Sequence, residues 1–147
     1  MRNLLKATVI VFFAGLFSCQ TFDNGGLVKK AEERVQNTWV LESYLRNGVD
    51  ETNTLMISDL EERYDQEGNY SRSYIDTDQS EFSETGSWDF LEDEKELSIS
   101  GVSSLPLSDL HSTVSSDYYT VLKLKKDQYW YSYTNGGDTH EFHFVPR

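Results

Sequence analysis

The sequence predicts an all-β fold, a single antiparallel up-and-down barrel of about eight short strands with a short N-terminal helix before it. From Thr38 onward, polar and apolar side chains alternate with period two, which is typical of strands that bury one face. Turn-forming residues interrupt this alternation at short intervals, so consecutive strands are expected to pair as a meander. Closure into a barrel removes the two exposed edges that an open meander would keep.

The N-terminal residues form a segment of different character. Arg2 and Lys6 precede an uncharged apolar run at 7–17, which is the layout of a secretory signal and is too short to span a bilayer. Ser18 and Cys19 follow, and this ending resembles the lipobox of bacterial lipoproteins, in which the cysteine thiol is joined to diacylglycerol and the chain is cut before it. We therefore expect a signal peptide at 1–18, and a lipid-anchored flexible tether at 19–26 that ends in two glycines.

The lipobox resemblance also implies a location. Gln20 stands where lipoproteins retained in the inner membrane of Gram-negative bacteria usually carry aspartate, so the outer membrane is favoured. Acyl chains such as palmitate on Cys19 would hold the protein there, because several chains together make release very slow. The sequence leaves open whether the domain faces the periplasm or the cell surface.

Charge and cysteine content exclude several classes of function. Residues 1–18 hold two of the 13 basic residues and none of the 25 acidic ones, so the mature chain keeps 11 basic against 25 acidic residues, a net charge of −14. Nucleic acid is a poor partner for such a chain, because binding it requires Lys and Arg to neutralise phosphates. Cys19 is the only cysteine, and once lipidated it leaves no thiol for a disulfide, a nucleophile or a metal site.

The domain at 27–147 is expected to begin with a helix. Leu27 or Val28, Ala31 and Val35 recur at helical spacing among charged residues, which predicts a short amphipathic helix that closes part of the fold. Strands are then expected at 38–45, 54–60, the two arms of a hairpin at 61–76, 80–91, 96–100, 118–125, 129–133 and 142–145. The serine-rich segment 101–117 has no sustained period, and with Leu105, Leu107 and Leu110 we expect it to lie across an opening.

The order of these patterns resembles bacterial lipocalin-like domains over roughly residues 35–147. The landmarks are, in order, Asn37-Thr38-Trp39-Val40-Leu41-Glu42-Ser43 followed by Asn47-Gly48, then Tyr64-Asp65-Gln66-Glu67-Gly68-Asn69-Tyr70, then Gly86-Ser87-Trp88-Asp89-Phe90 with Leu97, and the meander from Tyr118 to Phe144. The resemblance implies a lipocalin-like β-barrel. Proteins with that fold do not all bind a ligand, so the resemblance alone does not assign one.

Aromatic residues are the main candidates for a binding site. Of the 20 aromatic residues, 16 lie beyond Phe22. Strand parity places ten inside the barrel: Trp39, Tyr64, Tyr70, Trp88, Phe90, Tyr118, Tyr129, Tyr131, Phe142 and Phe144. Buried Tyr and Trp carry polar atoms that need partners, so such an interior suits a small apolar or amphiphilic ligand. An eight-stranded barrel is also just wide enough to be filled by its own side chains, and the sequence leaves both interpretations open.

The alternative function is a solid-cored interaction module that docks on another envelope protein. The residues expected to point outward, and so to serve this role, are Val40, Tyr44, Tyr119 and Trp130. Both interpretations describe a protein that binds a molecule or a partner, with membrane attachment only through the lipid on Cys19.

Catalytic and metal-binding patterns are weak. His140 and His143 are three residues apart on an expected strand, which sends them to opposite faces, and His111 stands alone in the serine-rich segment. No serine has the Gly-x-Ser-x-Gly spacing of a nucleophile elbow. The acidic groups at 61–62 and 92–96 are interpreted as solvated turns. We therefore expect no enzyme activity, no metal and no cofactor.

Overall fold

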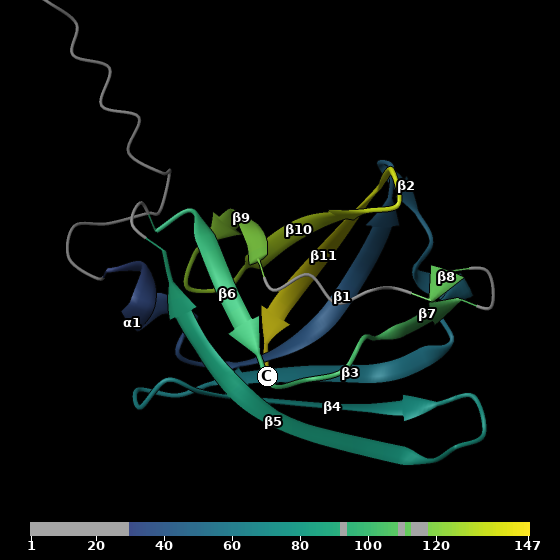
Figure 1. The fold of residues 1–147 in the computed structure, drawn as a ribbon, viewed down its shortest axis with the longest axis horizontal. Helices are drawn as coiled ribbons and strands as arrows, with labels where there is room; N and C mark the ends of the chain where they lie inside the picture. Colours follow the sequence, from purple (N-terminus) through teal and green to yellow (C-terminus); the bar gives the residue numbers. More distant parts are fainter. Residues whose placement is uncertain (1–29, 92–93, 109–110, 113–117) are drawn as a thin grey trace, which may run out of the picture.

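An antiparallel barrel of eight strands closes on itself, with one small helix at one end (Figure 1). This computed structural model describes residues 30–91, 94–108, 111–112 and 118–147. The elements are α1 (Ala31–Val35), β1 (Thr38–Arg46), β2 (Val49–Asp50), η1 (Thr52–Thr54), β3 (Ile57–Tyr64), β4 (Asn69–Asp76), β5 (Glu81–Phe90), β6 (Glu96–Ser100), β7 (Pro106–Ser108), β8 (His111–Ser112), β9 (Tyr118–Leu124), β10 (Tyr129–Asn135) and β11 (Asp138–Pro146). No helix among the described residues is long and apolar enough to cross a membrane.

The barrel follows the predicted meander. Neighbouring strands pair in the order β11-β10-β9-β6-β5-β4-β3-β1, and β1 pairs again with β11 to close the ring. The predicted Asn47-Gly48 turn is present, and both residues have positive φ, which explains why that pair follows β1. One boundary was wrong, since the expected strand at 54–60 and the first arm of the hairpin are one strand, β3. The signal segment, Cys19, the tether and Leu110 lie outside the described residues.

Two irregularities of register change which side chains point inward. On β1 the pairing with β11 shifts between Leu41 and Ser43, so Glu42 is an extra residue. On β9 the pairing with β10 shifts so that Leu122 is extra. A bulge of one residue reverses the alternation on one side of it. The prediction that Tyr44 points outward was therefore wrong, because Tyr44 lies beyond the bulge and is buried.

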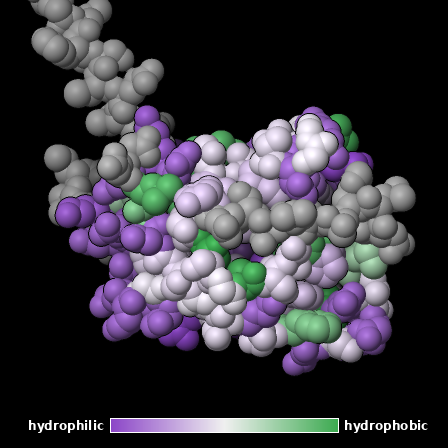
Figure 2. Space-filling view, viewed as in Figure 1, coloured by the Kyte–Doolittle hydropathy of each residue, from purple (hydrophilic) through white to green (hydrophobic). Residues whose placement is uncertain are grey.

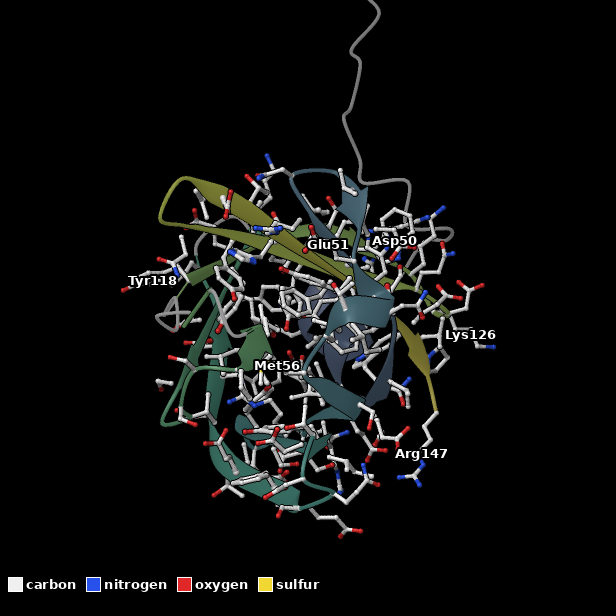
Figure 3. The ribbon with its side chains drawn as sticks, turned by 90° about the vertical axis from the view of Figure 1, so that its right-hand side faces the viewer. Asp50, Glu51, Met56, Tyr118, Lys126 and Arg147 are labelled. Carbon is white, nitrogen blue, oxygen red and sulfur yellow. The ribbon has the colours of Figure 1, made fainter. Side chains whose placement is uncertain are left out.

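The bulge on β9 has the same effect at the start of that strand. Tyr119, expected outside, is buried in the barrel, and Tyr118, expected inside, is 58% exposed. Figure 3 shows the Tyr118 side chain at the periphery of the molecule. The prediction of an inward-facing Tyr118 was wrong because the extra residue lies between it and Leu124, which does face the core.

The helix closes one end of the barrel, as its amphipathic pattern predicted. Ala31 and Val35 of α1 are buried, and the Val35 carbonyl accepts a hydrogen bond of 2.8 Å from Nε1 of Trp39. The Trp39 ring lies in turn against Tyr129, with 5.4 Å between ring centroids. In Figure 1 this end is on the left, and the β7–β8 hairpin lies at the opposite end.

A strap, defined here as residues 101–108, leaves β6 and crosses that opposite end. Its departure requires glycine at two places: Gly101 has φ of +83°, and a Cβ on Gly86 would overlap the carbonyl oxygen of Ser100. Leu105 and Leu107 are buried in the core, and the Leu107 carbonyl accepts a hydrogen bond of 3.2 Å from the Met56 amide. The prediction that this segment lies across an opening is confirmed for the described part.

Candidate functional site

Nine of the ten aromatic side chains predicted to face inward do so; Tyr118 is the exception. They are Trp39, Tyr64, Tyr70, Trp88, Phe90, Tyr129, Tyr131, Phe142 and Phe144. Toward the α1 end they form a continuous group of ring contacts, in which Tyr64 meets Tyr70, Trp88 and Tyr129 edge-on at centroid distances of 5.2, 5.8 and 5.7 Å. This part of the interior is filled by the protein's own side chains.

A carboxylate lies inside the barrel among the tyrosines. Glu62 of β3 is 1% exposed, so the prediction that Glu61 and Glu62 are both solvated was wrong for Glu62. Three hydroxyls donate to it: Tyr64 at 2.7 Å, and Tyr70 and Tyr131 at 2.9 Å each. Glu62 shares strand parity with Tyr64, and this signal could have identified it from the sequence.

Burial dominates the ionisation of this cluster. It raises the pKa of Glu62, although the hydrogen bond from Tyr64 and the charge of Arg72 act to lower that pKa. Burial also raises the pKa of Tyr64, Tyr70 and Tyr131 well above the ordinary value, with the nearby Glu62 adding to the shift. The tyrosines are therefore neutral donors at physiological pH, and their role toward Glu62 is to compensate for lost water.

Arg72 is the second charged group buried in the barrel, and it shares strand parity with Tyr70 on β4. It lies directly opposite Glu62 in the register of β3 and β4 and is 4% exposed. Nη2 of Arg72 donates to the Ser103 carbonyl of the strap at 2.6 Å and to the Glu84 carboxylate, which also accepts from Ser103. Burial acts to raise the pKa of Glu84, but the hydrogen bonds from Ser103 and Arg72 outweigh it and the pKa is lowered.

One hydrogen-bond donor of Arg72 has no acceptor. Its Nε is buried and has no hydrogen-bond partner. Arg72 borders a small hollow of about 10 Å³ under the strap, and the other residues that line it are Ser103, Ser104, Leu105, Tyr119, Tyr131 and Tyr133. The hollow lies between the strap and the tyrosines of β9 and β10.

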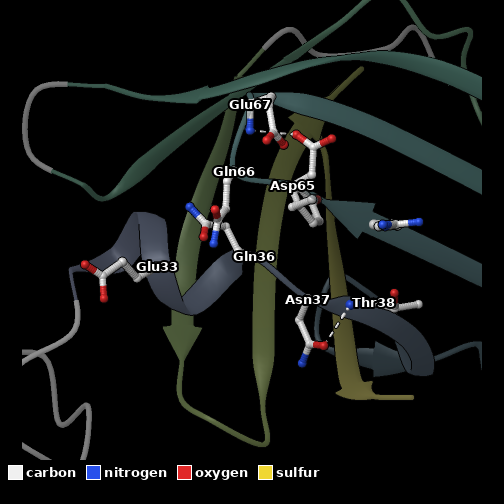
Figure 4. Close-up of a pocket in the computed structure, with 9 residues that line it drawn as sticks. Glu33, Gln36, Asn37, Thr38, Asp65, Gln66 and Glu67 are labelled. Atoms are coloured by element: carbon white, nitrogen blue, oxygen red, sulfur yellow. Dashed lines mark hydrogen bonds between the residues drawn. The ribbon is translucent and has the colours of Figure 1, made fainter.

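The larger grooves of the described surface have a different chemistry. One of about 460 Å³ lies between α1 and the β3–β4 turn and is open to solvent (Figure 4). Its lining is mostly polar, and two of its side chains hold the local turns: Asn37 Oδ1 accepts from the Thr38 amide at 2.9 Å, and Asp65 Oδ1 accepts from the amides of Glu67 and Asn69 at 3.0 and 2.8 Å. These bonds hold the two turns, so this groove does not offer an apolar site.

The histidines lie on opposite faces of β11, as their spacing predicted. His140 is buried, and its Nδ1 is 2.7 Å from the Tyr44 hydroxyl. His143 lies on the outer face, stacked on Trp130 with 3.9 Å between ring centroids. Nζ of Lys123 lies 3.8 Å from the centroid of the Trp130 ring. Within the part of the chain that the structure describes, no three His, Cys, Asp or Glu side chains are grouped as metal ligands.

The outer surface carries few large apolar side chains among the described residues. Figure 2 shows one face, on which hydrophilic and near-neutral residues surround scattered hydrophobic ones. The large hydrophobic residues that are exposed are Val49, Phe82, Tyr118 and Leu122. Of the four residues proposed for docking, Tyr44 and Tyr119 are buried, whereas Val40 and Trp130 are half-buried on the outer face.

Comparison with solved structures identifies the fold class. The barrel superposes on a lipocalin-like protein from Bacteroides uniformis with a TM-score of 0.54 at 16% identity, over 78% of this chain and 99% of that one. It also superposes on an uncharacterized protein from Bacteroides eggerthii with a TM-score of 0.51 at 13% identity, over 77% and 99% of the two chains. The chain therefore has a lipocalin-like fold, and the predicted resemblance is confirmed at that level.

A third similarity is weaker. Japanin from Rhipicephalus appendiculatus, whose structure contains cholesterol, matches with a TM-score of 0.46 at 11% identity, over 81% of this chain and 79% of that one. No protein-family model and no curated protein matches the sequence.

Proposed function

We propose that this chain is a lipid-anchored lipoprotein of the cell envelope, held in the outer membrane through Cys19, whose barrel binds a small apolar or amphiphilic molecule without altering it. Two observations support the proposal: the lipobox-like ending at 16–19 and the lipocalin-like barrel. The domain boundaries at residues 18 and 26 belong to the same proposal.

The observation that carries the binding role is the unpartnered Arg72 Nε inside the barrel. A barrel that served only as a solid scaffold would be expected to keep an apolar core, because each buried polar group without a partner costs free energy. Here a guanidinium with a spare donor lies beside tyrosines under a strap. An unpaired buried polar group in a native protein calls for an explanation, such as strain, a functional role, or an ordered water or ion that acts as its partner.

Binding would require the strap to move. Leu105 and Leu107 occupy the end of the interior opposite α1, and the described hollow there has a volume of only about 10 Å³. Hydrogen bonds to Arg72, Glu84 and Met56, the pairing of β7 with β8 and the burial of Leu105 and Leu107 hold the strap in place. A ligand that replaces the two leucines would have to offset the loss of these contacts by burying apolar area of its own.

Ligand titration tests the binding role. The mature chain with Cys19→Ser, which cannot be lipidated, is titrated with lipids, pigments and hydrophobic metabolites while tryptophan fluorescence and native mass spectra are recorded. We expect saturable binding of at least one class, together with faster amide exchange at 101–108 in the complex as the strap is displaced. The absence of saturable binding from every class would count against the proposal.

Metabolic labelling tests the anchor. Cells expressing the full chain receive labelled palmitate, and inner and outer membranes are separated on a density gradient. We expect label on the wild-type chain and none on Cys19→Ser, which should move to the soluble fraction. Recovery of the Cys19→Ser chain in the membrane fraction would refute attachment through this residue.

Docking on another envelope protein is the second candidate function. It is supported by the half-buried Trp130, whose Nε1 has no hydrogen-bond partner and whose ring is held between His143 and Lys123 on the outer face. Co-purification from solubilised membranes with the wild-type chain and with Trp130→Glu tests this role. An identical set of co-purified proteins in the two samples would exclude Trp130 from docking.

A further inference from the structure

We propose that the open edge of β5, defined here as residues 81–85, binds an extended basic segment of a partner protein as an added β-strand. The proposal gives the chain an interaction surface that depends neither on a ligand inside the barrel nor on movement of the strap. It combines a sheet edge without a neighbouring strand, an exposed aromatic side chain on that edge and the acidic residues around it.

β5 has a neighbour on both sides along only part of its length. β4 pairs with β5 from Glu81 to Ser87. β6 pairs with β5 only from Ser87 to Phe90. Figure 1 shows the first half of β5 running beyond the end of β6, with β4 alongside it. Within the part of the chain that the structure describes, residues 81–85 are therefore paired on one side only.

Hydrogen bonds near the end of β5 show which backbone groups point to this edge. The Trp88 amide donates to the Gly68 carbonyl, on the β4 side. The Leu91 amide donates to the Glu96 carbonyl, on the β6 side. Successive residues of a strand direct their backbone groups to opposite sides, and the register of β4 with β5 has no shift. The odd-numbered residues of 81–85 therefore direct their amides and carbonyls toward the open edge.

These outward-pointing groups are accessible to another strand. Glu81, Ser83 and Thr85 are exposed, and the backbone groups of Glu81 and Ser83 have no hydrogen-bond partner among the described residues. Lysine, proline and bulges protect many natural sheet edges, but residues 81–85 contain no Lys or Pro and their pairing with β4 has no bulge. An extended segment can therefore form main-chain hydrogen bonds along this edge.

Phe82 supplies an apolar contact beside these groups. Its ring is 43% exposed and is stacked on Tyr74 of β4, with 5.4 Å between ring centroids. Because side chains alternate along a strand, Phe82 lies on the opposite face of β5 from Glu81 and Ser83. An added strand places one side chain directly across from Phe82, so an apolar residue at that position covers the exposed ring.

The charge of the β4–β5 hairpin favours a basic partner. Residues 73–86 contain no Lys or Arg. Their acidic residues are Asp76, Asp78, Glu81 and Glu84. Glu84 is paired with Arg72, and the other carboxylates attract a segment that carries Lys or Arg on the Glu81 face. A second copy of the chain is disfavoured, because it would bring an equally acidic hairpin to the edge.

Three fluorescein-labelled heptapeptides test the proposal. One alternates Lys and Val, the second alternates Glu and Val, and the third is the Lys–Val peptide with every backbone amide N-methylated, which keeps the charge but has no backbone donor. Their Kd values for the mature chain with Cys19→Ser are measured by fluorescence anisotropy. We expect the Lys–Val peptide to bind about tenfold or more tightly than the other two, and less tightly at high salt.

Variants of β5 locate the site. Ser83→Pro removes an amide that points away from β4, so the ladder with β4 persists and the Kd of the Lys–Val peptide should rise about tenfold. Ser83→Ala keeps that amide and should leave the Kd unchanged. Glu81→Lys should raise the Kd about fivefold, whereas Asp127→Lys makes the same change of charge in the exposed β9–β10 turn and should have little effect. Thermal unfolding verifies that the variants fold.

Amide exchange measured by NMR gives a readout at single residues that needs no variant. The amides of Glu81 and Ser83 should exchange fast in the free chain and slowly with the Lys–Val peptide bound. Those of Phe82 and Glu84 point to β4 and should be protected in both states.

Four outcomes would overturn the proposal. The first is no saturable binding of the Lys–Val peptide, and the second is equal affinity of its N-methylated form. The third is unchanged exchange at Glu81 and Ser83 in the complex. The fourth is self-association of the chain, seen by sedimentation and abolished in Ser83→Pro, which would make a second copy the occupant. None of these outcomes bears on the ligand-binding role, which the titrations above test separately.

Discussion

Replacing Glu62 by leucine should be one of the most damaging single changes in the barrel. The substitution removes the acceptor of three buried tyrosine hydroxyls, those of Tyr64, Tyr70 and Tyr131, and water cannot reach them. A buried hydroxyl left without its partner costs about 1–3 kcal/mol. Tyr70 and Tyr131 lose their acceptor, whereas the Tyr64 hydroxyl keeps a weaker partner in the Tyr129 hydroxyl at 3.3 Å. Offset in part because a desolvated carboxylate is also removed, these losses give about 3–5 kcal/mol.

Urea unfolding of the mature chain measures this loss. With a slope of about 2 kcal/mol/M, the midpoint should fall by about 2 M, a large fraction of the 5–15 kcal/mol that typical domains have. Glu61→Leu is the matched control, because Glu61 is the adjacent residue on the outer face and pairs with Arg147 at 2.6 Å. Arg147 is 71% exposed, so this change should cost less than about 1 kcal/mol.

A rescue experiment separates the loss of hydrogen bonds from a simple packing defect. Adding Tyr64→Phe, Tyr70→Phe and Tyr131→Phe to Glu62→Leu removes the orphaned hydroxyls together with their acceptor. Replacement of both partners by apolar groups is nearly neutral, so the midpoint should return most of the way to the wild-type value. Equal destabilisation by Glu62→Leu and Glu61→Leu, or no recovery in the combined variant, would refute this account of the core.

Three further outcomes are expected. Burial raises the pKa of Glu62 in the folded state above its ordinary value of 4.5, so the folded state binds more protons than the unfolded state at pH values between the unfolded and the folded pKa. The free energy of unfolding should therefore fall as the pH rises through that range. Urea unfolding at a series of pH values measures this fall, which should be missing in Glu62→Gln. Gly86→Ala should lower the free energy of unfolding by about 1–3 kcal/mol, measured by thermal unfolding, and should increase amide exchange in the strap, because the added Cβ would overlap the Ser100 carbonyl oxygen. Thr85→Ala is the control, since Thr85 is the adjacent residue and is exposed, and it should lower that free energy much less. Similar values for the two variants would contradict the close approach of Gly86 to Ser100. Trp39→Phe removes the hydrogen bond to Val35, so proteolysis at the N-terminal side of α1 should accelerate while near-UV circular dichroism of the barrel persists; unchanged proteolysis would show that α1 is held by other contacts.

The strand pattern of this chain was largely predictable because each strand buries one face. Alternation placed Trp39, Trp88 and Leu97 correctly, and the Asn47-Gly48 pair identified its turn through the φ values that it must adopt. The errors at Tyr44 and Tyr118 share one physical origin. A single extra residue in a strand leaves composition and periodicity almost unchanged but reverses the orientation of every side chain beyond it.

The polar part of the candidate site was less accessible to sequence reasoning. Glu62 and Arg72 are charged residues on strands, and most such residues are solvated, so polarity argued against their burial. Glu62 shares strand parity with Tyr64, and Arg72 shares it with Tyr70, and this parity indicated their burial more reliably than their polarity did. The contact of Arg72 with Ser103 joins residues far apart in the sequence, and only the three-dimensional path of the strap brings them together.

The pairing of β1 with β11 constrains the order in which this protein can fold. Trp39 pairs with Pro146 and Val40 with Val145, so the barrel cannot close until β11 has been synthesised. Contacts separated by more than a hundred positions make assembly slow, because loop entropy must be lost before the contact forms. A nascent chain that stops short of β11 would present two unpaired strand edges at once, and a newly made copy would remain vulnerable to chaperones and proteases until its last strand is added.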